Sequence, residues 1–515
     1  MSRLNKLLPP LLLALAVFLF WWKAYPHALA YQEQFQLFLF DGDYLSQRLA
    51  LPGGLARWLA ELLVQFYNNP LFGALVLAAV FVGGYLLCAR LTGLRGLSLL
   101  PVVLLWHAMG DENVLLTYAV ALLLALAVCC GLRSLRRPWL LAAVAVVGLP
   151  LLYWLIGPMA LLPALYMAAV LPFSVPQRWL AAIAGLVAIA AVLLTAHICS
   201  LRLPFPPASF FIGLDYYRVP QVLPLLFVVI PLSVVLLAAL QQPLKTVSSR
   251  GLIIKTVSSR GLIAFLVVAA FGIWFVPRGF EAKKYELIDY DYLVRTGQWR
   301  AIIQKAEARQ PDLPMSVAAT NLALAMEGQL GERAAQFFQN GPQGLVPTFE
   351  RNFATTQLTG EIYFRLGLVN TAQRLAFEAM EALPNYAKSV RVVRRLAETN
   401  IVNGQYAVAR KYLKLLSKTL FYRRWAAQTA ALLDQGEAAI DAHPVYGHLR
   451  RLRLADDFLF SERELDKIFG QLFLHNPANN MARQYLLLWP RLEGDQAKYQ
   501  RYLEVVRSHQ PGIQQ

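Results

Sequence analysis

Apolar and polar positions divide the chain into two parts that follow different patterns. Up to about residue 277, long apolar stretches alternate with short polar connections, as expected for helices that cross a membrane. Beyond that point, apolar residues recur every three or four positions, which is typical of helices with one buried face. The sequence therefore predicts an all-α protein, with a transmembrane domain at 1–277 and a helical domain at 278–515.

Nine apolar stretches of the first part are candidate membrane spans. They are 7–25, 71–89, 97–109, 114–132, 138–156, 158–173, 179–197, 221–240 and 262–277. Two of them, 97–109 and 158–173, are shorter than the roughly 20 residues that a perpendicular span needs, so the sequence leaves their full crossing open. We predict about nine spans, and an odd number places the two ends of the chain on opposite sides of the membrane.

The charges of the connections predict which side each connection faces. If the N-terminus is inside, the cytoplasmic connections carry Arg and Lys but no acid, which matches the positive-inside bias. The opposite connections carry the acids Glu33, Asp41, Asp43, Glu61, Asp111, Glu112 and Asp215. We therefore expect a multi-pass protein of the cell inner membrane, with a cytoplasmic N-terminus and a periplasmic second domain.

The composition supports a membrane protein and argues against a nucleic-acid partner. The chain is 57% hydrophobic and only 15% charged, which is too apolar for a purely soluble protein of 515 residues. Its formal net charge of +17 comes largely from the cytoplasmic connections of the first part, so orientation explains much of it. No nucleic acid is expected as a partner.

The second part contains a repeated helical pattern. Around Thr355–Gly367, the small Gly360 and Ala372 would let two antiparallel helices approach closely, Tyr363 would fill the groove between them, and Gly367 would allow the turn. This pattern resembles a tetratricopeptide repeat. Irregular further copies carry turn glycines at Gly297, Gly328, Gly367 and Gly404. The resemblance implies a helical solenoid that binds a protein or glycan partner.

The outer acids are the candidate chemistry of the first part. The loop 26–70 contains Asp41 and Asp43, followed by a helix at 55–66 with one apolar face that should lie in the membrane interface. Asp111 and Glu112 are expected on the same side, as are the loop residues Arg202, Tyr217 and Arg218. Asp and Gly also favour ordinary turns, and Asp111–Asn113 could simply cap a helix, so these alternatives remain open.

The layout of spans, acidic outer loop and repeats resembles the GT-C superfamily of membrane glycosyltransferases. The resemblance implies a polyprenyl-phosphate sugar as the lipid donor, with Asp41 or Asp43 deprotonating the acceptor hydroxyl. Arg202 or Arg218 would hold the phosphate, Asp111 and Glu112 would contact the acceptor or a metal, and Tyr217 would contact substrate. No cofactor is certain, although a divalent cation could replace the arginines. The glycine between the two acids departs from the adjacent pair of many members.

Three segments, 52–72, 290–299 and 418–425, resemble an uncharacterised family of Bacteroidota membrane proteins of unknown function. This resemblance implies no activity.

Three hypotheses follow from the sequence. The first is a GT-C-type glycosyltransferase on the outer face of the inner membrane, whose repeats bind the acceptor. The second is a non-enzymatic, membrane-anchored repeat scaffold for envelope assembly, because repeat solenoids are mostly binding modules. The third, a transporter, is disfavoured because no charged residue lies clearly within a span. Motifs of common soluble enzymes, such as HExxH and GxSxG, are absent.

Overall fold

The fold is helical throughout the part of the chain that the structure describes. The structure is a computed structural model, and it describes residues 3–135, 137–173, 175, 177–212, 223–248, 256–348, 350, 353–383, 387–454 and 464–509. None of these residues forms a β-strand, so the predicted all-α class is confirmed. The chain divides into two compact units, of which the first comprises Met1–Glu33 and Phe40–Ala282 and the second Gln34–Leu39 and Lys283–Gln515.

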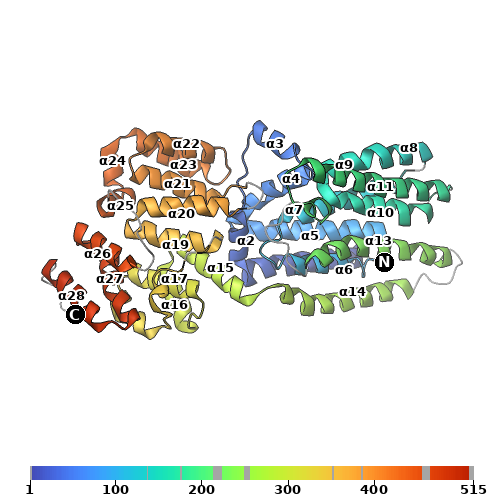
Figure 1. The fold of residues 1–515 in the computed structure, drawn as a ribbon. Coiled ribbons are helices and arrows are strands. Elements are labelled where there is room, and N and C mark those ends of the chain that lie inside the picture. Colours follow the sequence, from blue (N-terminus) through green and yellow to red (C-terminus); the bar gives the residue numbers. More distant parts are fainter. Residues whose placement is uncertain are drawn as a thin grey trace. The chain divides into compact units, whose positions relative to one another are not determined.

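The first unit is built from apolar helices (Figure 1). They are α1 (Arg3–Leu19), α2 (Pro26–Glu33), α3 (Gly42–Leu49), α4 (Gly54–Val64), α5 (Pro70–Thr92), α6 (Leu99–Ala108), α7 (Leu116–Leu132), α8 (Pro138–Ala143), α9 (Leu149–Ile156), α10 (Leu161–Ala169), α11 (Arg178–Arg202), α12 (Ser209–Ile212), α13 (Leu223–Ser248) and α14 (Thr256–Phe275). Short 3-10 or π-helical segments join several of them, including η1 (Phe20–Ala24), η4 (Gly157–Ala160) and η6 (Val276–Gly279).

Each of the nine predicted apolar stretches contains a helix, although several begin or end outside it. Within the described part of the chain, five helical segments are long and apolar enough to cross a membrane, namely Leu7–Ala24, Pro70–Thr92, Pro138–Phe173, Arg178–Arg202 and Gly261–Gly279. The 36-residue segment Pro138–Phe173 is bent at Gly157, whose φ of 69° and ψ of −150° interrupt the helix between α9 and α10. The chain is therefore a membrane protein by the length and composition of its helices.

The surface of the first unit also fits a lipid environment. Large apolar side chains are exposed on several of its helices, with Leu11 on α1, Leu186 on α11 and Ile273 on α14 more than half exposed. Where helices touch, small residues bring them close, because a Cβ atom added to Gly185 of α11 would lie 2.3 Å from the backbone of Ala168 in α10. Small residues at contacts and large apolar ones facing outward are typical of helices packed in a membrane.

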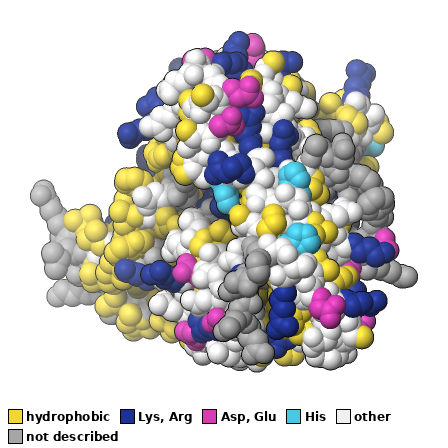
Figure 2. All heavy atoms as spheres, turned by 90° about the vertical axis from the view of Figure 1, so that its left-hand side faces the viewer, with side chains coloured by type: hydrophobic (Ala, Val, Ile, Leu, Met, Phe, Trp, Pro, Cys, Tyr) yellow, Lys and Arg dark blue, Asp and Glu magenta, His cyan; other side chains and the backbone are white. Residues whose placement is uncertain are grey.

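The second unit consists of shorter, more polar helices. They are α15 (Ala282–Arg295), α16 (Trp299–Ala308), α17 (Pro314–Met326), α18 (Leu330–Arg333), α19 (Phe353–Leu366), α20 (Val369–Glu381), α21 (Val390–Val402), α22 (Tyr406–Ser417), α23 (Arg423–Asp434), α24 (Glu437–Ala442), α25 (Tyr446–Leu452), α26 (Leu465–His475), α27 (Asn480–Glu493) and α28 (Gln496–His509). In sequence order, α19 to α23 pack each against the next and lie side by side in Figure 1. Charged side chains and histidines are spread over the face of this unit that Figure 2 shows.

One turn geometry recurs between consecutive helices of the second unit. The four turn glycines expected from the sequence all have positive φ and end a helix: Gly297, Gly328, Gly367 and Gly404. After each glycine, the next backbone N–H donates to the carbonyl five residues earlier, as from Leu368 to Tyr363 at 2.9 Å and from Gln405 to Asn400 at 2.8 Å. This is the Schellman helix ending, in which glycine adopts the left-handed conformation without steric cost.

Candidate functional site

The predicted catalytic pair, Asp41 and Asp43, lies at the start of α3. Asp41 is the N-cap of the helix, and one of its carboxylate oxygens accepts a hydrogen bond from the backbone N–H of Asp43 at 3.3 Å. The side chain of Asp43 is exposed in the first turn. Both positions are favourable for acids, because the N-terminus of a helix has unsatisfied N–H groups and a partial positive charge.

Asp111 and Glu112 also lie in a local turn, between α6 and α7. Asp111 Oδ1 accepts from the backbone N and from Nδ2 of Asn113, at 2.8 and 2.9 Å. Glu112 Oε1 accepts from the same Nδ2 at 3.3 Å. The structure thus brings these two acids together around one asparagine, an arrangement that organises the turn.

The predicted phosphate and substrate contacts are only partly described. Arg202 is the last residue of α11 and is exposed, in a position where its charge complements the carbonyl end of the helix. Tyr217 and Arg218 lie outside the described residues. Among the described residues, no group of three or more His, Cys, Asp or Glu side chains is arranged to hold a metal ion. The proposed roles of the seven predicted residues therefore stay predictions.

A buried charge cluster that sequence reasoning missed lies a few residues further on, between α3 and α4. Glu61 is buried and accepts from Arg48 Nε at 2.8 Å and from Arg57 Nε at 3.0 Å. The hydroxyl of Tyr44 also donates to Glu61, and Arg48 Nη2 donates to that hydroxyl at 2.9 Å. Burial, followed by the charge of Glu61, raises the pKa of Tyr44 well above its usual value.

The cluster was detectable in the sequence as two pairs spaced four residues apart. Tyr44 and Arg48 share one face of α3, and Arg57 and Glu61 share one face of α4. What the spacing does not reveal is that the two faces meet. They do so because Gly54 lets the turn close: a Cβ atom there would lie 2.1 Å from the carbonyl oxygen of Arg48.

Helix α4 has the two faces that its sequence predicts, with the small residues turned inward. Ala56, Ala60 and Glu61 are buried, and α4 packs against α7. Each residue of the predicted apolar face is partly exposed: Leu55, Trp58, Leu59, Leu62, Leu63 and Phe66. Trp154 of α9 makes two hydrogen bonds to the hairpin of α3 and α4. Its Nε1 donates to the carbonyl of Leu49 at 2.8 Å, and its carbonyl accepts from the backbone N–H of Gly53 at 2.9 Å.

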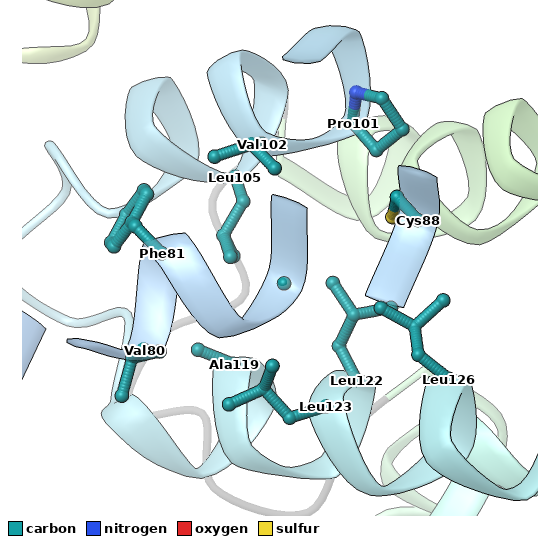
Figure 3. Close-up of a pocket in the computed structure, with 11 residues that line it drawn as sticks. Val80, Phe81, Cys88, Pro101, Val102, Leu105, Ala119, Leu122, Leu123 and Leu126 are labelled. Atoms are coloured by element: carbon teal, nitrogen blue, oxygen red, sulfur yellow. The ribbon is translucent and has the colours of Figure 1, made fainter. Parts of the chain in front are cut away.

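A small pocket lies among α5, α6 and α7 (Figure 3). Its lining is apolar and includes Phe81, Leu105 and Leu122, with the Cys88 thiol at one end. Such a lining can accommodate an alkyl group, and apart from the single thiol it offers no side chain for acid, base or metal chemistry. This pocket is therefore not a candidate active site.

The second unit contains a buried polar contact with a distant part of the chain. Arg391 of α21 donates from Nη1 to both carboxylate oxygens of Asp291 in α15, at 2.7 and 2.9 Å. The same nitrogen donates to Oε1 of Gln34 at 3.0 Å. Gln34 belongs to the segment Gln34–Leu39, which is part of this unit although it precedes α3 in the chain. Leu37 of the segment is buried in the apolar core of the second unit, and Leu39 packs against that core.

Next to this contact, arginines of α19 and α21 surround a second buried acid. Glu361 accepts from Arg365 Nε at 2.8 Å and is also bonded by Arg395. Arg395 in turn lies 3.2 Å from Glu398. Burial alone would raise the pKa of Glu361, but the charges of Arg395, Arg365 and Arg391 lower it to about 2.

The whole chain matches one family of proteins. Residues 3–514 match the family described as "Family of unknown function (DUF6057)". The chain belongs to this family. No curated protein and no solved structure gives a match. Membership covers both units, so it supports the sequence resemblance to an uncharacterised family, and it assigns no activity.

In the part of this DUF6057 member that the structure describes, three places hold a buried acid in contact with arginine: the α3–α4 cluster, the Asp291–Arg391 contact and the Glu361 network. In the first, one carboxylate contacts two arginines, and all three side chains lie within the α3–α4 hairpin. The other two share α21 and adjoin a segment of non-helical chain, which makes them the stronger candidate for recognition of a ligand.

Proposed function

We propose that this DUF6057 protein is a non-enzymatic, membrane-anchored scaffold whose second unit binds a polypeptide partner. The first unit anchors the chain in the inner membrane, and the second unit acts on the periplasmic side in assembly of the envelope. The observation that carries the proposal is the segment Gln34–Leu39, which the second unit holds through Arg391 and through the core around Leu37. Helical arrays that hold one peptide segment offer the chemistry to hold another.

The helical hairpins support the choice of a tetratricopeptide-like solenoid. The helices α19, α20, α21 and α22 are 12 to 14 residues long, and glycine turns of one geometry join α19 to α20 and α21 to α22. In solenoids of such hairpins, corresponding helices of successive repeats line one extended surface. Here α19 and α21 correspond, and both carry the buried arginines and acids described above.

The glycosyltransferase hypothesis has less support from the geometry, and it stays a prediction. A general base needs a carboxylate within reach of the acceptor hydroxyl. Asp41 caps α3 and Asp111 organises a turn, so the local bonds of both acids have ordinary structural explanations. These bonds favour the scaffold as the better-supported function.

Photo-crosslinking in the native membrane tests the scaffold directly. A photoreactive amino acid would replace Lys388, an exposed residue just before α21. In a control variant, it would replace Arg410, an exposed residue of α22. We expect a discrete polypeptide adduct from position 388, and a weaker adduct or none from position 410. The adduct from position 388 should be unchanged when Asp41→Asn is added. Absence of any polypeptide adduct, together with sugar transfer that depends on Asp41, would reject the scaffold in favour of the enzyme.

A further inference from the structure

We propose that the partner of the second unit is an extended polypeptide segment with a carboxylate side chain and, three residues later, an aliphatic side chain. In this proposal, which rests on the function proposed above, Gln34–Leu39 occupies the partner's binding surface as a weaker substitute. We call the region formed by Asp291, Arg391 and the core around Leu37 the segment-binding surface.

The bound segment has the features of a recognised peptide. Residues Gln36–Leu39 form neither helix nor strand, and the side chains from Gln34 to Phe38 are buried. Leu37 and Leu39 both contact the core of the second unit. Because this stretch is not helical and side chains two positions apart both reach the core, we infer that it binds as an extended peptide does.

The fit of this segment is incomplete at its polar positions. The Arg391 side chain is 10% exposed, and its Nη2 is buried without a hydrogen-bond partner in the part of the chain that the structure describes. In the segment itself, Oε1 of Gln36 is likewise buried with no partner among the described residues. Buried polar groups without partners reduce affinity, so an occupant that satisfies them would bind more tightly.

A carboxylate at the position of Gln34 would complete the contact. The amide of Gln34 offers Arg391 one acceptor atom, whereas a carboxylate offers two and can accept from both Nη1 and Nη2. Its charge is also compatible with the surroundings despite the nearby Asp291. The ion pairs around α19 and α21 involve four arginines, Arg365, Arg391, Arg394 and Arg395, and three carboxylates, Asp291, Glu361 and Glu398. Within this set of ion pairs, the arginines outnumber the carboxylates by one.

Binding of matched peptides to the full-length protein in lipid nanodiscs tests this inference. The probe is a fluorescent ten-residue peptide that copies residues 32–41, with Glu in place of Gln34 and two added lysines for solubility. The control peptides retain Gln34 or replace Leu37 by Asp. Three protein variants are compared with the wild type. Leu37→Asp weakens binding of the chain's own segment, and Gln34→Glu strengthens it. Arg391→Met removes the guanidinium that would bind the carboxylate.

We expect the Leu37→Asp protein to bind the Glu peptide about tenfold more tightly than the wild type does, because its own segment competes less. The Glu peptide should bind about tenfold more tightly than the Gln peptide, and the Arg391→Met protein should not show this preference. The control peptide with Asp in place of Leu37 should not bind. The full-length Gln34→Glu protein should bind the probe more weakly than the wild type. This last comparison keeps Leu37 intact, so it decides the matter even if Leu37→Asp prevents folding.

Two results would overturn the inference: equal affinity for the Glu and Gln peptides in the folded Leu37→Asp protein, or unchanged probe binding in the Gln34→Glu protein. If either occurs while the polypeptide adduct at position 388 persists, the scaffold stands and only this assignment of partner and surface fails. If the adduct is also absent and sugar transfer depends on Asp41, the proposed function fails with it.

Discussion

Gln34 and Arg391 are 357 positions apart in the chain, and Arg391 Nη1 donates to Gln34 Oε1 over 3.0 Å. Gln34 follows the first apolar helices, whereas Arg391 belongs to a helix of the second unit. The contact means that the second unit is not assembled from one continuous stretch of sequence. It incorporates six residues, Gln34–Leu39, that come from between α2 and α3 of the first unit.

The buried Glu61 should be a major source of stability for the α3–α4 hairpin. Glu61→Gln keeps the shape of the side chain but removes the negative charge that Arg48 and Arg57 share, so we expect a loss of roughly 3–5 kcal/mol of unfolding free energy. Thermal unfolding in detergent micelles would measure the loss. Asp43→Asn, which alters an exposed acid of the same hairpin, should leave the unfolding temperature unchanged. Equal unfolding temperatures for both variants would contradict a stabilising role of the cluster.

Asp41 allows its structural and catalytic roles to be separated. Asparagine caps a helix about as well as aspartate, so Asp41→Asn should be stable, whereas Asp41→Ala should lose about 0.5–2 kcal/mol. If the chain is a scaffold, Asp41→Asn and Asp43→Asn should behave as the wild type does in every assay. Loss of sugar transfer from a polyprenyl-phosphate donor in stable Asp41→Asn membranes would instead identify Asp41 as a base, because asparagine cannot take up the proton.

The close approach of α6 and the end of α14 should tolerate no added side chain. A Cβ atom at Gly279 would lie 2.2 Å from the carbonyl oxygen of His107, whose Nδ1 donates to the carbonyl of Phe275 at 2.8 Å. We expect Gly279→Ala to lower the yield of folded protein and its unfolding temperature. Gly131→Ala, at a helical position with no atom nearby, is the matched control and should be neutral. A normal Gly279→Ala protein would argue against this packing.

The second unit should lose stability in acid through Glu361. Its pKa of about 2 in the folded chain lies below the ordinary value of 4.5, so the folded state favours the ionised form. The resulting stability, on the order of 3 kcal/mol, is fully present above about pH 4.5 and is lost as the pH falls toward 2. Denaturant unfolding at several pH values should therefore show a smaller acid dependence for Glu361→Gln than for the wild type. An identical dependence would show that Glu361 titrates normally.

Much of the helical architecture was predictable from the sequence, because it depends on local composition and spacing. The apolar stretches predicted helices, and each of them contains one. The turn glycines Gly297, Gly328, Gly367 and Gly404 were identifiable since the left-handed conformation at a helix end favours glycine over every other residue. The number of spans that cross the membrane and their orientation remain predictions of hydropathy and charge.

The candidate sites were less accessible, because the sequence displays residue types but not which of them meet. Asp41 and Asp43 stood out as acids in a loop, and their position at a helix N-terminus gives them a local structural role. Glu61 was visible only as one acid on an amphipathic helix, although two arginines and a tyrosine converge on it.

The sequence by itself determined the helical class, the division into an apolar and a more polar part, and the positions of the glycine turns. Each of these follows from interactions between residues a few positions apart. Only the tertiary structure decided that Gln34–Leu39 joins the second unit, that Arg391 contacts both Asp291 and Gln34, and that Glu61 is buried between α3 and α4. These contacts depend on which helix faces meet, and the side-chain spacing within one helix does not contain that information.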